Sequence, residues 1–353
     1  MISGFRASQL KGLGAEAASE NQRLATVRNL TGKEVLDLIR GDLQKVEEEF
    51  CRQSLSQAHP IAEIGQYLQV SGGKRLRPAL LLLAARLCGY EGPTAVRLGT
   101  VVELLHTATL IHDDVIDEAD MRRGRPSTNS RWGNHVSVLA GDWLYMQAFK
   151  CAQAERNFEI LELLIDLTQQ MVEGELMQLS CLRKMDVTEE QYLDLAFRKT
   201  ACLFSVCLRL GAMLAGKSKE VEMQLGTYGT NVGLAFQLTD DVLDFTSSED
   251  VLGKPTGSDL REGKVTLPLI YLLRQCRPEE RQKVSTVLDE GGFSSVQYGE
   301  IVELVERYGT LQAVRDKAQE FAARARSSLD GLPESSYRDA LRSLPENIVD
   351  REF

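Results

Sequence analysis

The chain has 353 residues, 43% hydrophobic and 26% charged, so it can bury a large core and shows no sign of wholesale disorder. Its formal net charge of −10 excludes nucleic acid as the main partner and disfavours an anionic membrane surface, because both require a basic protein face. No 18 uncharged apolar residues run together and no signal-peptide core stands near the start, so we expect no transmembrane segment.

The seven cysteines are scattered and include no Cys-x-x-Cys pair, which indicates a reducing compartment and a cytoplasmic protein. Residues 1–28 are polar and lack periodicity, so we predict a mobile tail or dimer arm ahead of one catalytic domain over 29–353. Thr31, followed three residues later by Glu34, predicts the start of a helix whose apolar stripe runs from Val35 to Val46. A short helix is expected after Pro60.

Two glycines and three basic residues form the next feature, the segment Ser71-Gly-Gly-Lys-Arg-Leu-Arg-Pro78. Lys74 and Arg77 lie three residues apart, and Pro78 suits the first position of the apolar helix that follows. Such a turn predicts a phosphate clamp. The alternative is an exposed basic helix start, which the helix dipole disfavours unless an anion is bound there.

A predicted helix from Thr94 to Asp117 changes from apolar to anionic at its end, where it carries Asp113, Asp114 and Asp117. Asp113 and Asp117 are four residues apart and therefore share one face, in line with His106. Carboxylates paired in this way repel one another unless a cation lies between them, and their hard oxygens suit Mg²⁺. Taken alone, the stretch could equally be a solvated acidic turn.

A second copy of this pattern favours the metal site over the acidic turn. The segment from Gln237 to Asp244 again approaches through apolar residues and carries Asp240, Asp241 and Asp244. Two triads facing each other would hold about six negative charges, which requires bound cations. Because Mg²⁺ completes its coordination with phosphate oxygens, a polyphosphate substrate is expected.

Basic residues lie between and after the two motifs: Arg122, Arg123, Lys199, Lys254 and Lys264. Lys199 and Thr200 stand in an apolar stretch, where a lysine is costly unless its charge is used, although it could also extend to the surface. Further apolar helices are predicted over 136–149, 160–182 and 267–273, with others beginning near 278, 297 and 310. No alternating pattern is long enough for a sheet, so the fold is expected to be all-α.

The segments GGKRLRP, DDVID followed by MRRGRPS, KT, QLTDDVLD and two downstream GK pairs closely resemble those of the trans-type polyprenyl diphosphate synthases, especially long-chain members. The match runs from about residue 31 to the C-terminus. The resemblance implies mostly antiparallel helices around a deep cavity, a homodimer, and a prenyl transferase with three Mg²⁺ ions per active site once substrate is bound. An allylic diphosphate would be ionised, and isopentenyl diphosphate would be added repeatedly.

The resemblance also implies roles for single residues. Metal ligands would be Asp113, Asp117 and Asp240, with Asp114, Asp241 and Asp244 beside them. The departing allylic diphosphate would meet Arg122, Lys199 and Lys254, and isopentenyl diphosphate would meet Lys74, Arg77, His106 and Arg123, with Lys264 also binding substrate. Thr200 and Gln237 would face the allylic cation. Gln178 replaces a fourth Asp ligand of short-chain relatives, which puts a metal role there in doubt.

Product length is expected to depend on the same helix. The family stops a growing tail with bulky residues just before the first Asp motif, whereas Ala108 and Thr109 are small here and Leu105 lies further down. We therefore expect a long-chain product. The alternatives are a geranylgeranyl- or farnesyl-length product, and small residues that serve only close helix packing.

Three other functions fit parts of the pattern less well. A class I terpene cyclase would lack the second Asp triad and the Gly-Gly-Lys turn. A metal phosphohydrolase built on His106, His112 and Asp113 would need more than the four histidines present. A non-catalytic subunit of a heteromeric synthase would tend to lose the Asp motifs, and both are intact.

Overall fold

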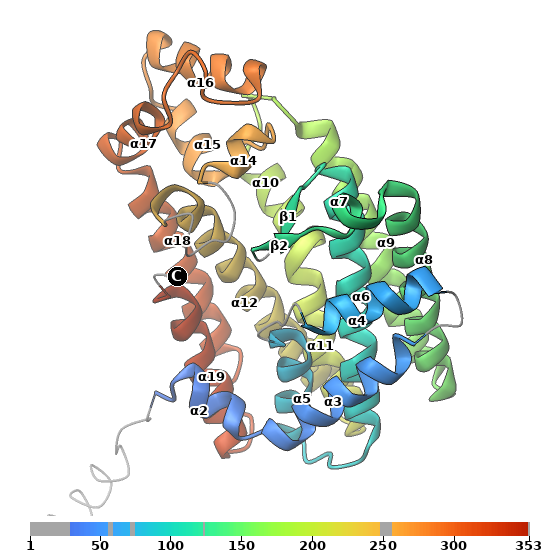
Figure 1. Ribbon diagram of the computed structural model, residues 1–353. Helices are drawn as coiled ribbons and strands as arrows, with labels where there is room; N and C mark the ends of the chain where they lie inside the picture. The colour runs from blue at the N-terminus through green and yellow to red at the C-terminus, as the bar shows by residue number, and fades with distance from the viewer. Residues whose placement is uncertain (1–28, 56–58, 71–74, 123, 248–255, 352–353) are drawn as a thin grey trace, which may run out of the picture.

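The computed structural model describes residues 29–55, 59–70, 75–122, 124–247 and 256–351. In these ranges the regular structure is helical apart from one hairpin of two-residue strands, which confirms the all-α prediction (Figure 1). The N-terminal half contains α2 (Gly32–Asp37), α3 (Arg40–Gln53), α4 (His59–Val70), α5 (Leu76–Leu87), α6 (Thr94–Ile116), β1 (Met121–Arg122), β2 (Arg125–Pro126), α7 (Thr128–Trp132), α8 (Asn134–Ala154) and α9 (Phe158–Cys181).

The C-terminal half contains α10 (Glu189–Ala196), η1 (Phe197–Ala201), α11 (Cys202–Leu214), α12 (Lys219–Thr246), α14 (Ser258–Arg261), α15 (Leu267–Leu273), α16 (Pro278–Glu290), α17 (Tyr298–Arg307), α18 (Thr310–Ser327) and α19 (Ser336–Val349). No helix of the described ranges is both long and apolar enough to cross a membrane. The predicted tail over residues 1–28 lies outside the description.

Helix α5 lies at the centre of the larger core. Its residues 79–85 are all fully buried, which is typical of a helix that is covered by neighbours on every side. It packs against α6, α11, α3 and α19, and α6 in turn packs along α8. The end of α6 that carries the first Asp motif is therefore fixed to a rigid scaffold.

Helix α12 joins the two hydrophobic cores of the molecule. Its first half packs in the larger core through residues such as Leu225 and Tyr228, and its second half packs in a smaller core with α15 and α18 through Leu238 and Val242. Figure 1 shows α12 running beside α18 toward α14 and α15. The second Asp motif lies on the last turns of α12, next to the smaller core.

The structure differs from the predicted helices at four points. The capping box at Thr31 is present, but the predicted single helix is divided into α2 and α3 at Leu38 and Ile39. Helix α5 begins at Leu76, so Pro78 occupies its third position. The apolar stretch over 195–214 is interrupted by the π-helical turn η1, and α19 was not predicted.

Candidate active site

The first Asp motif lies where α6 ends. Glu118 adopts a left-handed conformation with φ of 50°, and the Ala119 N–H donates to the Asp114 carbonyl, which closes the helix. Asp114 turns inward, is 3% exposed, and forms an ion pair with the guanidinium Nε of Arg122. Asp114, predicted to lie at or beside the metal, is therefore the partner of Arg122 in this structure.

Asp113 lies among other charges at low solvent exposure. Burial raises the pKa of Asp113 to about 6; the positive charge of Lys199 works against this rise, and the carboxylates of Glu175 and Asp117 add to it. Three carboxylates with mutual electrostatic influence in a partly dry site favour a bound cation.

The turn η1 directs Lys199 and Thr200 into the site. It is a π-helical turn, which inserts an extra residue and changes the direction of side chains. Glycines on both neighbouring helices allow close approach: a Cβ on Gly174 of α9 would lie 2.7 Å from the Cβ of Arg198, and one on Gly233 of α12 would lie 2.5 Å from the Cα of Ala201. The backbone of η1 is therefore clamped between α9 and α12.

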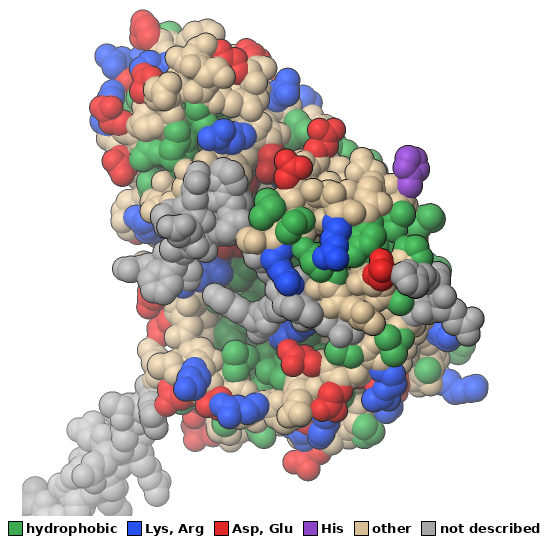
Figure 2. Space-filling model, in the orientation of Figure 1, with side chains coloured by type: hydrophobic (Ala, Val, Ile, Leu, Met, Phe, Trp, Pro, Cys, Tyr) green, Lys and Arg blue, Asp and Glu red, His purple; other side chains and the backbone are tan. Residues whose placement is uncertain are grey.

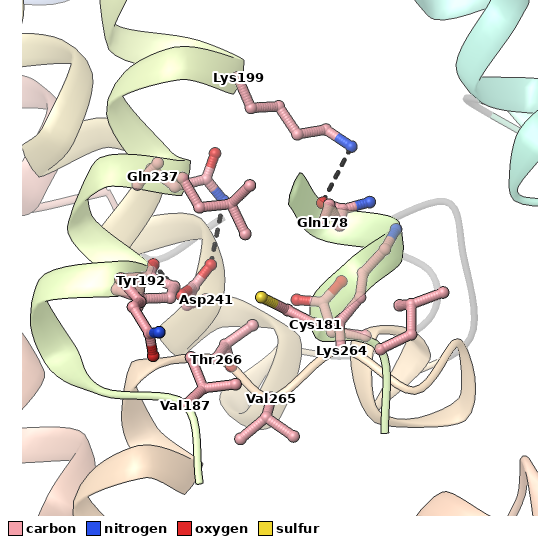
Figure 3. Close-up of a pocket in the computed structure, with 15 residues that line it drawn as sticks. Gln178, Cys181, Val187, Tyr192, Lys199, Gln237, Asp241, Lys264, Val265 and Thr266 are labelled. Carbon is pink, nitrogen blue, oxygen red and sulfur yellow. Dashed lines mark hydrogen bonds between the residues drawn. The ribbon is translucent and has the colours of Figure 1, made fainter. Parts of the chain in front are cut away.

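Lys199 is used inside the site and does not extend freely to the surface. Its Nζ donates to Gln178 Oε1 at 3.1 Å (Figure 3). The same Nζ lies 2.9 Å from Glu175 Oε2. Gln178 also donates to Glu175 Oε1 at 3.1 Å. Gln178 therefore holds the lysine and the glutamate together.

A hydrogen-bonded chain connects η1 with the second Asp motif. Thr200 Oγ1 donates to Gln237 Oε1 at 2.8 Å, and Gln237 Nε2 donates to Asp241 Oδ1 at 3.0 Å. The hydroxyl of Tyr192 donates to the other oxygen of Asp241, which is 1% exposed. Burial raises the pKa of Asp241 well above its usual value. Thr200 and Gln237, predicted to act together, are in direct contact.

The three carboxylates of the second motif have different surroundings. Asp244 is buried and accepts from Ser258 Oγ at 2.9 Å and from the Asp259 N–H at 3.3 Å, so it orders the start of α14. Asp240 is the most exposed of the three and forms an ion pair with Arg351. Asp241 and Asp244 are buried among protein donors, so Asp240, which is paired with Arg351 but more exposed, is the carboxylate of this motif that a cation can reach best from solvent.

Lys264 binds the first Asp motif from the segment that follows α14. Its Nζ donates to Asp117 Oδ2 at 3.1 Å and is paired with Glu262. Burial opposes the charge on Lys264, but the carboxylates of Glu262, Asp117 and Asp259 outweigh it and raise the lysine pKa. Among the described residues, no three acidic, histidine or cysteine side chains form a ready metal cluster. The ammonium group of Lys264 instead offsets part of the acidic charge.

Two cavities meet at Lys199. The first, of about 160 Å³, is lined by apolar side chains such as Val187 and Leu195 together with Gln178, Gln237, Asp241 and Lys264 (Figure 3). The second, of about 310 Å³, lies between α6, α8 and α9 and is mainly apolar, with Asp113 and Glu175 also in its lining. Its lining includes Thr109, Tyr145, Met171, Val172 and Leu176. Of the three residues predicted to control product length, Thr109 lines this cavity, whereas Ala108 and Leu105 lie in the buried core.

The predicted isopentenyl side is described in part. Arg77 Nη1 lies 2.9 Å from His106 Nε2, and the Arg77 guanidinium stacks over Phe204 at 5.3 Å. Lys74, Arg123 and Lys254 were also predicted as site residues, but they lie outside the described residues.

Sequence reasoning missed several residues of the site. Glu175 follows Gly174 on α9 and binds Lys199, and Tyr192 donates to Asp241 from α10. Asp259 and Arg351 reach the second motif from later segments. Only Glu175 had a local signal, because an acidic residue on an otherwise apolar helix face suggests a partner.

Known proteins resemble this chain over most of its length. The polyprenyl synthetase family model matches residues 58–305. The octaprenyl diphosphate synthases of Haemophilus influenzae and Escherichia coli are each 38% identical over 320 residues, which cover 91% of this chain and 97% and 99% of theirs. A polyprenyl synthase from Caulobacter crescentus, solved with calcium and isoprenyl diphosphate, superposes with a TM-score of 0.88 at 33% identity and covers 92% of this chain and 99% of that one. The chain therefore belongs to the polyprenyl synthetase family and is a prenyltransferase.

Proposed function

We propose that the chain condenses an allylic diphosphate with successive isopentenyl diphosphates, head to tail and in trans geometry, to give a long-chain polyprenyl diphosphate. The observation that carries this proposal is the junction at Lys199. The cavity on one side holds the Asp241 carboxylate of α12 with Lys199 and Lys264, and the mainly apolar cavity on the other side has the Asp113 carboxylate of α6 in its lining. A substrate with a charged head and a hydrocarbon tail matches both sides.

Mg²⁺ fits the residues present. Asp113, Asp117 and Asp240 supply hard carboxylate oxygens, and a divalent cation would offset the burial and the neighbouring carboxylates that raise the pKa of Asp113. We propose these three residues as ligands of the magnesium ions, three per active site with substrate bound. Bound Mg²⁺ would supply charge neutralisation of the diphosphate oxygens.

The protein's own cations would complete that neutralisation. Lys199 and Lys264 each form an ion pair with a carboxylate in this structure. When the C–O bond of the allylic substrate breaks, the electron pair leaves with the diphosphate. The same two ammonium groups can then bind the diphosphate oxygens and stabilise their negative charge. Thr200 and Gln237 place neutral oxygens near the resulting cation. The isopentenyl double bond then attacks this cation, and the released diphosphate takes a proton from the cationic adduct, which forms the double bond of the new allylic product.

Isopentenyl diphosphate is proposed to bind at Arg77 and His106, with Lys74 and Arg123. The contact, in which Arg77 Nη1 donates to His106 Nε2, brings the two side chains together, and the guanidinium would bind the phosphate oxygens there. The tail would grow from Asp113 into the apolar cavity past Thr109. A small residue at this position supports a long product.

A homodimer is proposed from the outer face of α8 and α9. Four apolar residues of α9 recur every seven positions and are exposed: Phe158, Ile165, Val172 and Leu179. Leu139 and Met146 of α8 repeat the same interval at 63% and 64% exposure. A seven-residue apolar repeat on a helix surface is typical of contact with another helix.

A reducing, cytoplasmic location is proposed from the seven cysteines, none of which forms a disulfide.

The test is to incubate the purified protein with Mg²⁺, farnesyl diphosphate and labelled isopentenyl diphosphate and to size the products. Labelled chains several units longer than farnesyl support the proposal. One added unit indicates a short-chain synthase, unlabelled hydrocarbon a terpene cyclase, and released phosphate alone a phosphohydrolase. No turnover unless a second protein is added would identify a subunit of a heteromeric synthase.

A further inference from the structure

The hairpin that follows the first Asp motif places two arginines opposite each other. Strands β1 and β2 pair antiparallel, with Arg122 opposite Arg125, and Gly124 adopts a φ of 71° in the turn. Directly opposed residues of an antiparallel pair project from the same face, with Cβ atoms about 5 Å apart. Figure 2 shows basic side chains gathered near the middle of the molecular face where Figure 1 places this hairpin.

The two arginines differ in what they bind. Arg122 is paired with Asp114, as described above. Arg125 has no carboxylate partner among the described residues, and its Nη1 is a buried donor with no hydrogen-bond acceptor there. Two like charges directly opposite each other are destabilising, and a buried guanidinium donor without an acceptor adds to that cost. Both costs are removed if an anion binds across the pair.

Tyr67 of α4 fixes the guanidinium of Arg125 in place. The Arg125 Cζ lies 5.2 Å from the centre of the Tyr67 ring, a cation–π distance. The Tyr67 hydroxyl donates to the Pro126 carbonyl at 2.7 Å, and the ring meets Trp132 edge-on at 5.2 Å. Because the ring is held at its hydroxyl and at its edge, the stacked guanidinium is positioned in advance.

A small cavity of about 50 Å³ adjoins the hairpin at Arg122 and Pro126. Its lining combines apolar side chains with Tyr67, His106, Thr128 and the carboxylates of Glu103 and Asp114. Thr128 is 3% exposed, and its hydroxyl has no hydrogen-bond partner in the described part of the chain. The hairpin therefore borders, through Arg122 and Pro126, a cavity that the proposed isopentenyl residue His106 also lines, while Arg125 lies outside that lining.

We propose that Arg125 is a further diphosphate-binding residue, which binds a substrate diphosphate together with Arg122 on the opposite strand. Tyr67 is the positioning residue of Arg125. The inference rests on the proposed function for the identity of the ligand. A guanidinium stacked by an aromatic ring keeps its N–H edge free for two parallel hydrogen bonds to phosphate oxygens. A lysine would supply charge at this position but no such fork.

The experiment compares Arg125→Gln and Arg125→Lys with Arg131→Gln as the matched control. Arg131 is also an arginine stacked on Tyr67, at 4.8 Å, but it lies exposed on α7 outside the hairpin. Steady-state kinetics would give KM separately for isopentenyl and for farnesyl diphosphate, and calorimetry would give the affinity for inorganic diphosphate. Thermal melts would establish that each variant is folded.

We expect Arg125→Gln to raise KM for one of the two substrates about tenfold or more and to weaken diphosphate binding similarly, with kcat changed less. The substrate affected identifies which diphosphate is bound. Arg125→Lys should recover part of the loss, and Arg131→Gln should stay within about twofold of wild type. Unchanged binding in Arg125→Gln, or an equal loss in Arg131→Gln, would overturn the proposal.

The two proposals fail in different ways. If wild-type protein binds inorganic diphosphate through Arg125 but elongates no chain, the proposed function fails and the Arg125 site stands. If chains are elongated equally by wild type and Arg125→Gln with equal KM values, the function stands and the Arg125 site is refuted. Tyr67→Leu, which removes the ring, should reproduce the KM change of Arg125→Gln, whereas Tyr67→Phe should retain most of the affinity.

Discussion

In the metal-free protein, the charged Asp113 carboxylate should lower the free energy of unfolding at neutral pH. The pKa of this carboxyl rises from 3.8 to about 6 because burial disfavours its charge. A carboxyl whose folded pKa is raised is more stable in its protonated form, so its favourable contribution is complete below pH 3.8 and is lost as the pH rises through about 6. This rise in the pKa lowers the free energy of unfolding by about 3 kcal/mol at pH 8.

The perturbation is Asp113→Asn, which keeps the shape of the side chain and removes the titration. Without metal, the variant should be more stable than wild type by about 3 kcal/mol at pH 8 and by about 1 kcal/mol at pH 4.5. Urea unfolding in EDTA at the two pH values measures the difference. Asp316→Asn, on the exposed side of α18, changes the same charge and serves as the control. With Mg²⁺ and diphosphate present, wild type should gain more stability than Asp113→Asn. A variant less stable than wild type at pH 8 without metal would refute this reasoning.

Three other substitutions test separate parts of the site. Tyr192→Phe removes a donor from the buried carboxylate of Asp241 and should cost about 1.5–3 kcal/mol in urea unfolding; a loss below about 0.5 kcal/mol contradicts the contact. Thr109→Phe narrows the apolar cavity and should shorten the products sized by chromatography, so an unchanged distribution argues against that cavity as the tail site. Gly174→Ala would place a Cβ 2.7 Å from a side-chain atom of η1, so kcat should fall about tenfold with about 1–3 kcal/mol of stability lost. Gly299→Ala, which meets nothing within 4 Å, should leave kcat unchanged.

Local patterns in the sequence predicted the parts of the fold that depend on interactions between residues close together in the chain. The capping box at Thr31 and the apolar helix over 267–273 are present as expected. Asp113 and Asp117 could be placed together because they are one helical turn apart on α6. The contact between Thr200 and Gln237 followed from the family resemblance and not from spacing.

Other features depend on distant contacts and have no local signal. Asp117 and Lys264 are 147 residues apart, and Asp240 and Arg351 are 111 apart, so no sequence window contains either pair. The turn η1 carries neither glycine nor proline, and its shape depends on neighbouring helices that approach through their own glycines. Helix α19 was missed although Ala340, Leu344 and Ile348 recur at helical spacing; Pro345 inside it lowered the helical signal.

The division between α2 and α3 shows how tertiary packing overrides propensity. No glycine or proline marks the break at Leu38 and Ile39, where the Ile39 side chain turns into the core and is 2% exposed. Burial of that side chain favours a break over one continuous helix. Patterns of periodicity report which residues are buried but not the angle between successive helices.

The central claim is that carboxylates at the ends of α6 and α12 bind magnesium ions that in turn hold one diphosphate. Isothermal titration of a non-hydrolysable farnesyl diphosphate analogue into wild type, Asp117→Asn and Asp240→Asn, with Mg²⁺ and with EDTA, measures this directly. We predict that wild type binds tightly only with Mg²⁺ and that the affinity of both variants is lower by a factor of about ten or more. Equal binding in EDTA, or wild-type affinity in Asp240→Asn, would contradict the claim.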